Sequence, residues 1–205
     1  MKIAILTFDG FNEIDSFVAL AMLNRMKPQG WQAFITSPTE TLTSMNGVTI
    51  ERQKPLSFAA EADAMLVGSG VKTRDVAADD GLLAQIRLDP ERQLIGAQCS
   101  GTLILAKLGL LNGLPACADL TTTPWVREAG IEVIDAPFIA HGNVATTGGC
   151  LGANYLASWF IARGAGFAAA EAALHYVAPV GEQADWLSRM RSVITPYLAT
   201  ETVSA

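Results

Sequence analysis

The sequence has little of the chemistry that metal centres and nucleic-acid surfaces require. It contains only two histidines, and neither stands at a metal-ligand spacing from a cysteine or a carboxylate. Basic residues number 14 against 20 acidic ones, which gives a formal net charge of −6, and no basic cluster occurs. These scarcities argue against a metalloenzyme, and against nucleic acid or an anionic membrane as the main partner.

Long uninterrupted hydrophobic runs are also missing. The longest apolar stretches are broken by Gln98, Lys107 or Arg163, so none reaches the length of a transmembrane helix. The first apolar run meets Asp9 and Gly10 too early for a signal peptide. The three cysteines are odd in number and form no dense framework, which favours a reducing compartment. We therefore expect a cytoplasmic protein with no membrane partner.

What the chain does have is enough apolar material for a substantial core. Hydrophobic residues make up 50% of the 205 residues and charged residues 17%, a balance that disfavours disorder. No linker, internal repeat or low-complexity segment interrupts it. We expect one domain over residues 1–205, with a frayed tail after about residue 198.

Strand patterns and helix patterns alternate along most of the chain. Short apolar runs, typical of strands buried on both faces, occupy residues 2–8, 31–37, 64–67 and 94–98. This alternation predicts an α/β fold, a mostly parallel sheet with helices on both faces. Helix patterns occupy residues 13–26, 81–88, 101–111, 121–128, 150–162, 167–176 and 183–195.

Three further segments carry expectations about local structure. Asn46-Gly47 lies between residues 42–44 and 48–50 and predicts a hairpin with a two-residue turn. Residues 131–134 have the composition of another strand. Residues 138–146 read as a pair of strands around a turn at 141–143.

Residues 94–101 have the pattern of a nucleophile elbow, a strand followed by a sharp turn and a helix. The apolar run from Leu94 to Gln98 leads into Cys99, Ser100 and Gly101, after which a helical pattern begins. A side chain at such a turn stands at the carboxyl edge of the sheet, where open α/β proteins bind ligands. The following helix directs its N–H groups at the sulfur and favours thiolate, the nucleophilic form. The alternative interpretation is a buried structural cysteine.

Chain order predicts that a carboxylate and a glycine loop reach the same edge. Asp15 falls in the first turn of the helix after the first strand, and residues 68–70 follow the third apolar run. The alternative for Asp15 is an ordinary helix-start acid favoured by the helix dipole. Glu13 is a neighbouring candidate, and Asp9 is more typical of a turn residue.

If Asp15 touches Cys99, the two groups should share one proton, because a carboxylate beside a thiolate is costly. A protonated Asp15 has a proton to give, and afterwards a carboxylate that activates water. The N–H groups of Ser100 and Gly70 are candidate donors to an anionic intermediate. Ser100 Oγ is a candidate contact to substrate, or alternatively a helix-cap hydroxyl.

Two glycine-rich stretches partly match the dinucleotide-binding fingerprint. Residues 68–73 lack the third glycine of a dinucleotide fingerprint, and residues 164–169 lie between two helices, where the required strand is missing. Neither predicts a nucleotide cofactor. Cys150 follows Gly148-Gly149 at a helix start, so it is either a second thiol of the pocket or a packing residue.

These residues together resemble the ThiJ/PfpI superfamily over nearly the whole chain. The resemblance implies a flavodoxin-like three-layer sandwich, usually dimeric, with a cysteine at the elbow and an acid from the first helix beside it. The features that carry it are residues 3–10 with Asp15, Leu66–Gly70, Gln98–Thr102, Leu108–Gly113, Thr147–Gly149 and Tyr176.

An aspartate, with a hydroxyl residue directly after the cysteine, resembles the isonitrile hydratase branch. By that resemblance Asp15 is the acid/base, Cys99 the nucleophile and Ser100 a hydrogen-bonding residue. Ser69, Gly70, Gly101 and Cys150 are then expected around the oxyanion and substrate. The sequence departs from the branch at Ser100, usually threonine, at Pro124, usually histidine, and at Ser69, where the loop is usually Pro-Gly-Gly. These departures bear on the substrate more than on the fold.

The leading expectation is a cofactor-free and metal-free hydratase of small carbon–nitrogen compounds that acts as a homodimer on a small-molecule substrate. A second hypothesis keeps the same residues but uses a 2-oxoaldehyde. A third is a redox sensor in which Cys99 is oxidised to sulfinate beside Asp15. Ser100 stands where the family's protease-like members have histidine, which argues against a peptidase.

Overall fold

A seven-stranded sheet forms the middle layer of the computed structural model, which describes residues 1–198. The strand order is β5-β2-β1-β6-β7-β9-β8, and every neighbouring pair is parallel except β8 with β9. The strands are β1 (Lys2–Leu6), β2 (Gln32–Ser37), β5 (Lys54–Pro55), β6 (Ala64–Val67), β7 (Leu94–Gln98), β8 (Phe138–His141) and β9 (Val144–Thr147); β3 (Thr41–Thr43) and β4 (Thr49–Glu51) form a separate antiparallel pair.

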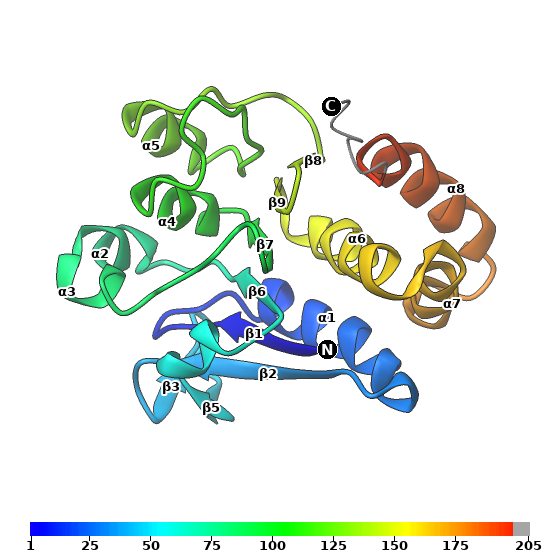
Figure 1. Cartoon of the computed structure of the whole chain (residues 1–205), viewed down its shortest axis with the longest axis horizontal. Coiled ribbons are helices and arrows are strands. Elements are labelled where there is room, and N and C mark those ends of the chain that lie inside the picture. The colour runs from blue at the N-terminus through cyan, green and yellow to red at the C-terminus, as the bar shows by residue number, and fades with distance from the viewer. Residues whose placement is uncertain (199–205) are drawn as a thin grey trace.

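Helices cover both faces of this sheet, as the alternating pattern predicted (Figure 1). The group α2 to α5 lies over one face, and α1 with α6 lies over the other, backed by α7 and α8. The helices are α1 (Glu13–Leu23), α2 (Thr73–Ala78), α3 (Asp80–Leu83), α4 (Gly101–Lys107), α5 (Thr123–Glu128), α6 (Ala153–Ala165), α7 (Phe167–Val177) and α8 (Gln183–Ile194), with 3-10 turns at η1 (Asn24–Gln29), η2 (Leu56–Ala60), η3 (Cys150–Gly152) and η4 (Thr195–Tyr197).

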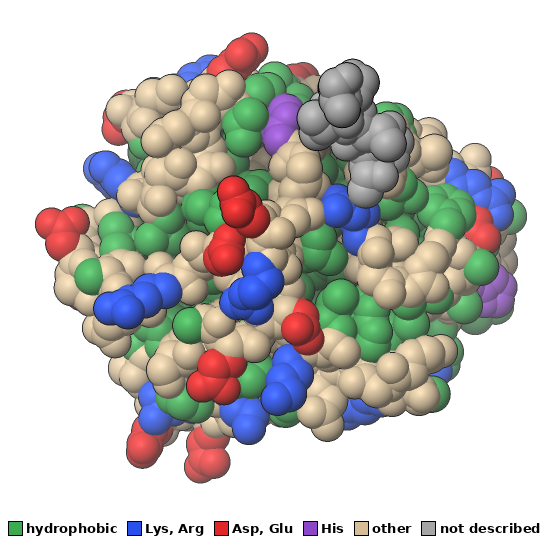
Figure 2. Space-filling model, in the orientation of Figure 1, with side chains coloured by type: hydrophobic (Ala, Val, Ile, Leu, Met, Phe, Trp, Pro, Cys, Tyr) green, Lys and Arg blue, Asp and Glu red, His purple; other side chains and the backbone are tan. Residues whose placement is uncertain are grey.

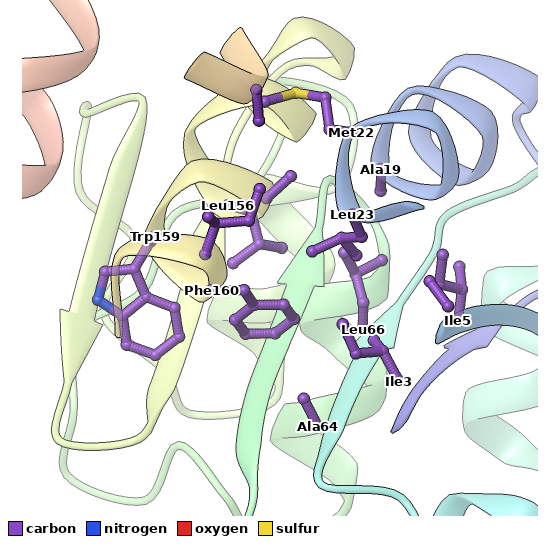
Figure 3. Packing of buried hydrophobic residues seen from close by; sticks show 14 of the residues in the cluster. Ile3, Ile5, Ala19, Met22, Leu23, Ala64, Leu66, Leu156, Trp159 and Phe160 are labelled. Atoms are coloured by element: carbon purple, nitrogen blue, oxygen red, sulfur yellow. The ribbon is translucent and has the colours of Figure 1, made fainter. Parts of the chain in front are cut away.

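The strands are apolar on both faces because both faces are covered. Along β1, Ile3 and Ile5 point toward α1 and α6, and Ala4 and Leu6 point toward the opposite helices. Figure 3 shows the first of these cores, in which side chains from α1 and α6 pack with those of β1 and β6, while α6 itself lies against β7 and β9. Burial on both sides fixes the register of each strand, since a slip by one residue would exchange the two faces.

Several local expectations were wrong in detail. The hairpin forms, but Thr43 pairs with Thr49, so its loop has five residues in place of two. Residues 131–134 form no strand of the sheet and contribute only an isolated bridge from Val133 to Ala116. The helix expected over 81–88 is the single turn α3. In the first two cases backbone hydrogen bonds with neighbouring segments replace the local pattern, whereas after α3 the chain continues in single turns, with the Gln85 N–H donating to the Leu82 carbonyl and the Ile86 N–H to the Leu83 carbonyl.

The expected tail after residue 198 lies outside the described residues. None of the helices within residues 1–198 combines the length and apolar character that crossing a membrane requires. On the face drawn in Figure 2, acidic and basic side chains are interspersed, and blue spheres gather into no broad patch.

The α1–α6 core makes a first prediction. Leu156 on α6 is fully buried and lies against Gly96 of β7, whereas Leu120 is 92% exposed. Leu156→Ala should lower the free energy of unfolding by about 2–5 kcal/mol, because it leaves a cavity that the surroundings refill only in part. Leu120→Ala, the same change at the surface, should stay within about 0.5 kcal/mol of wild type. Urea denaturation compares them, and equal losses would contradict the assigned packing.

Candidate functional site

Cys99 occupies the sharp turn between β7 and α4 that the elbow motif predicted. Its φ is 49°, and within residues 1–198 it is the one non-glycine residue with a positive φ. Such a conformation costs on the order of 1–3 kcal/mol and persists because the surroundings hold it. The Cys99 N–H donates to the Thr147 carbonyl at 2.9 Å, and the side chain is 3% exposed.

Gly101 lets the elbow approach the neighbouring strand. A Cβ at this position would lie 2.6 Å from the carbonyl oxygens of Val67 and Gly68, both backbone atoms that cannot move aside easily. The close approach brings the start of α4 against the end of β6. Cys99 and the loop after β6 therefore meet at the carboxyl edge of the sheet, as expected from parallel strands.

Asp15 reaches the same place from the first turn of α1. Asn12 caps this helix by accepting a hydrogen bond from the Ile14 N–H at 3.0 Å. The Asp15 side chain is fully buried, and Ser69 Oγ donates to its Oδ2 at 2.5 Å. Its Oδ1 has no hydrogen-bond partner in the part of the chain that the structure describes. Burial raises the pKa of Asp15, and the Ser69 hydrogen bond opposes only part of that rise.

Asp15, Cys99 and Cys150 form a compact cluster. One carboxylate oxygen and the two Sγ atoms all lie within 4.8 Å of one another. Burial raises the pKa of the Cys99 thiol, and the negative charge of Asp15 raises it further. The pKa of Cys150 rises for the same two reasons, burial first. A thiolate at Cys99 therefore requires the proton to lie on Asp15, since two charges in the cluster would oppose one another.

These three groups do not make a ready cation site, although two sulfurs and a carboxylate are ligands that zinc accepts. In the metal-free site burial holds the pKa of all three groups above its ordinary value, so binding a cation would require the cluster to release protons. We assign no metal to the cluster. The expectation of a cofactor-free site stays a prediction.

The two other acidic residues near the first helix are engaged elsewhere. Asp9 forms an ion pair with Lys72 and accepts from the Thr43 N–H at 2.9 Å. Glu13 accepts hydrogen bonds from Ser44 and Asn46, on the loop between β3 and β4. Asp9 thus links β3 to Lys72, and Glu13 holds the loop between β3 and β4 beside the start of α1. Asp15 is the acid that faces the cysteine.

Ser100 ties the elbow to the loop after β6. Its Oγ lies 2.7 Å from Thr73 Oγ1 and accepts from the Gly70 N–H at 3.2 Å. Thr73 Oγ1 donates its own proton to the Gly70 carbonyl at 2.8 Å, so Ser100 is left to donate to Thr73. The Gly70 N–H and the Ser100 hydroxyl, both expected to contact substrate, are therefore paired with protein groups in this structure.

Other N–H groups remain open at the start of α4. Among the described residues, the backbone N–H groups of Ser100 and Gly101 have no hydrogen-bond acceptor. They are the unpaired donors that every helix start leaves, and they follow directly after the sulfur-bearing residue. Partial positive charge from these groups favours negative charge at Cys99 and opposes some of the cost of burial.

A cavity of about 400 Å³ opens over Cys99. Trp125 lines it, while its neighbour Pro124 lies in the wall of an adjoining hollow. Pro124, one of the positions where the sequence differs from the branch it resembles, is thus the sequence neighbour of a residue in the cavity wall. The lining residues are Asn12, Met45, Ser69, Gly70, Val71, Cys99, Ser100, Asp119, Thr121, Thr122, Trp125 and Cys150.

Sequence reasoning missed several polar residues of this site, namely Asn12, Asp119, Thr121 and Thr122 in the cavity lining and Thr73 behind Ser100. Asn12 Nδ2 donates to Cys150 Sγ at 3.2 Å, and Thr73 holds Ser100 as described. Asn12 carries the signal of a helix N-cap, a polar residue immediately before an apolar helix, which also places it beside Asp15. Thr73 lies in the short helix α2, which the sequence pattern did not reveal.

Comparison with known proteins gives a consistent result. A family model described as the DJ-1/PfpI family matches residues 1–163. A deglycase from Thermococcus kodakarensis is 27% identical over 149 residues, covering 70% of this chain and 87% of the relative.

Solved structures agree in fold. A ThiJ/PfpI family protein from Pseudomonas syringae superposes with a TM-score of 0.77 at 20% identity, over 95% of this chain and 87% of that one. Schizosaccharomyces pombe DJ-1 gives a TM-score of 0.73 at 17% identity, over 87% of this chain and 100% of that one.

The buried carboxyl leads to a second prediction. Because the folded-state pKa of Asp15 lies above its ordinary 3.8, the folded protein binds this proton more tightly than the unfolded chain does. Stability contributed by this group is present below pH 3.8 and is lost as pH rises through the folded pKa. Asp15→Asn should therefore unfold at a higher temperature than wild type at neutral pH, with the gain shrinking toward acid. A gain that is equal at both pH values would contradict the assigned protonation.

Proposed function

The chain belongs to the DJ-1/PfpI family, and on that premise we propose that it is a cysteine-dependent hydratase of small carbon–nitrogen compounds, similar to isonitrile hydratase. The substrate would be an isonitrile and the product an N-substituted formamide. The observation that carries this proposal is the buried Asp15 carboxyl beside the Cys99 sulfur, within 4.8 Å. A reaction at an isonitrile carbon needs a nucleophile and a proton donor at the same carbon.

In the first step Cys99 attacks the terminal carbon of the isonitrile as a thiolate. The pair then carries its one proton on Asp15, so the charge that raises the pKa of Cys99 is absent at that moment. A carbon–sulfur bond forms, and Asp15 gives its proton to the same carbon. The product of this step is a thioimidate on Cys99, with Asp15 left as a carboxylate.

In the second step the Asp15 carboxylate takes a proton from water, and the resulting hydroxide adds to the thioimidate carbon. As the tetrahedral intermediate collapses, the carbon–sulfur bond breaks and the proton of the added hydroxyl group moves to nitrogen, which releases the formamide. Cys99 returns to thiolate and Asp15 to carboxylic acid. Ser69, which donates to Asp15 Oδ2, keeps the carboxyl group directed into the site through both changes.

The surrounding residues position the intermediate. The N–H groups of Ser100 and Gly101 are open donors at the start of α4 and are the most direct support for developing negative charge. Gly70 and the Ser100 hydroxyl, which pair with one another, shape the wall between the elbow and the loop after β6. Cys150 lines the cavity next to the Cys99 sulfur.

A second candidate uses the same pair on a 2-oxoaldehyde. The deglycase among the relatives favours it, since glycation adducts derive from carbonyl compounds. Cys99 would add to the aldehyde carbon and Asp15 would move the proton between oxygen and carbon. This route produces an oxyanion at once, which the open N–H groups of Ser100 and Gly101 would have to meet without the Gly70 N–H, because that group is already paired. We therefore place the isonitrile first.

The expected homodimer remains a proposal. Apolar side chains are exposed beside the cavity, namely Met45, Val71 and Leu151, each about half exposed or more. A second copy that covered them would remove apolar surface from water near the mouth of the site. Light scattering on the purified protein tests this, and a monomeric mass would refute it.

Parallel assays with simple aryl and alkyl isonitriles and with methylglyoxal test the proposed function. We expect turnover of the isonitriles to be lost in Cys99→Ala and to fall by about 10²–10⁴-fold in Asp15→Asn, which cannot transfer the proton. Cys117→Ala serves as the control, because Cys117 is buried away from the cavity lining and should leave turnover unchanged.

Full isonitrile turnover by Cys99→Ala would end the proposal. Turnover of methylglyoxal without turnover of any isonitrile would favour the second candidate and keep the roles of Cys99 and Asp15. Loss of activity in Cys117→Ala together with a lowered melting temperature would show a folding defect, so each variant is checked by thermal unfolding.

A further inference from the structure

We propose that Cys150 is the resolving thiol of Cys99: a peroxide oxidises Cys99, and the two residues then close an intramolecular disulfide across the floor of the cavity. The proposal goes beyond the hydration reaction, although it uses the same sulfur. Cys99 lies in the turn between β7 and α4, and Cys150 begins η3. The proposal rests on the proximity of their Sγ atoms, which lie within 4.8 Å of each other. Its test measures mass and not turnover, so it stands or falls separately.

Cys150 is the partner that moves. The sulfur atoms must approach from at most 4.8 Å to about 2.05 Å. Cys99 is fixed by its hydrogen bond to Thr147 and by the close contact of Gly101 with β6. Cys150 begins a three-residue turn that follows Gly149, whose φ is 82° and around which there is open space. The next residue, Leu151, is 59% exposed, so the outer side of this turn has room to shift, while Gly148 and Gly152 at its two ends are closely packed.

The two thiols also differ in access, as a pair of this kind requires. Cys99 is 3% exposed and lies at the floor of the cavity, while Cys150 is partly exposed on its wall. A molecule as small as hydrogen peroxide reaches Cys99 through the cavity. Asn12 Nδ2, which donates to Cys150 Sγ at 3.2 Å, holds the second sulfur beside the first and favours its thiolate.

In the first step the Cys99 thiolate attacks one oxygen of hydrogen peroxide. A sulfur–oxygen bond forms, the oxygen–oxygen bond breaks, and the leaving hydroxide takes the proton of Asp15 to become water. Cys99 is now a sulfenic acid, oxidised by two electrons, and the peroxide has been reduced. Asp15 is a carboxylate with both thiol-bearing residues in reach.

In the second step Asp15 accepts the proton of the Cys150 thiol. The resulting thiolate attacks the sulfur of Cys99, the sulfur–sulfur bond forms, and the sulfur–oxygen bond breaks. The leaving hydroxide takes the proton back from Asp15 and departs as a second water. Over both steps two thiols and one hydrogen peroxide give one disulfide and two waters. The reaction closes the nucleophile off reversibly, before further oxidation to sulfinate.

The test is intact-protein mass spectrometry after treatment with hydrogen peroxide, without reductant. Wild type and Cys117→Ala should each lose the mass of two hydrogens as monomers, and regain it with dithiothreitol. Proteolysis without reduction should yield one linked pair of peptides, containing Cys99 and Cys150. Cys150→Ser, which keeps the size of the side chain, should instead gain the mass of oxygen at Cys99 and resist recovery once sulfinate forms.

Three results would overturn the proposal. One is wild type that gains oxygen at Cys99 with no loss of two hydrogens. Another is a disulfide that contains Cys117 or joins two chains. The third is a Cys150→Ser protein that oxidises as reversibly as wild type. Thermal unfolding of Cys150→Ser confirms that it is folded, and iodoacetamide labelling of Cys99 in that variant confirms that the first thiol still reacts.

Discussion

The site depends on the burial of a carboxyl group against two thiols. Asp15 is fully buried, and one of its oxygens, Cys99 Sγ and Cys150 Sγ lie within 4.8 Å of one another. Two negative charges at this distance are costly where water is excluded, so the protonation state of Asp15 controls that of the two thiols. Burial raises the pKa of Asp15, and burial together with the Asp15 charge raises the pKa of Cys99. The proposed hydration and the proposed disulfide both proceed by moving that proton.

The fold supplies the rigidity that the constraint requires. Cys99 is held at a φ of 49° by the parallel strands on either side and by the close approach of Gly101. Asp15 is held by a capped helix and by Ser69. The turn at Cys150 has open space on its outer side, around Gly149 and the exposed Leu151. The chemistry thus combines one fixed sulfur, one fixed acid and one thiol with room to move.

The sequence predicted the fold class and the meeting of Cys99 with Asp15 because both follow from simple rules that apply to the whole chain. Apolar runs separated by helices specify a parallel sheet, and the carboxyl ends of such strands share an edge. It did not predict the pairing of Ser100 with Thr73, because Thr73 lies in a short helix whose pattern is too brief to read. The predicted loop at Asn46 was too short for a different reason: Asp9 and Glu13, which are distant in sequence, hold this hairpin through hydrogen bonds that a local pattern does not contain.

The most direct test of this account is where the shared proton lies at neutral pH. An infrared difference spectrum between wild type and Asp15→Asn isolates the vibrations of that one carboxyl group. The account predicts the carbonyl band of a protonated carboxylic acid in wild type, and no S–H band that disappears in Cys99→Ser. A carboxylate band at Asp15, together with an S–H band that Cys99→Ser removes, would contradict it.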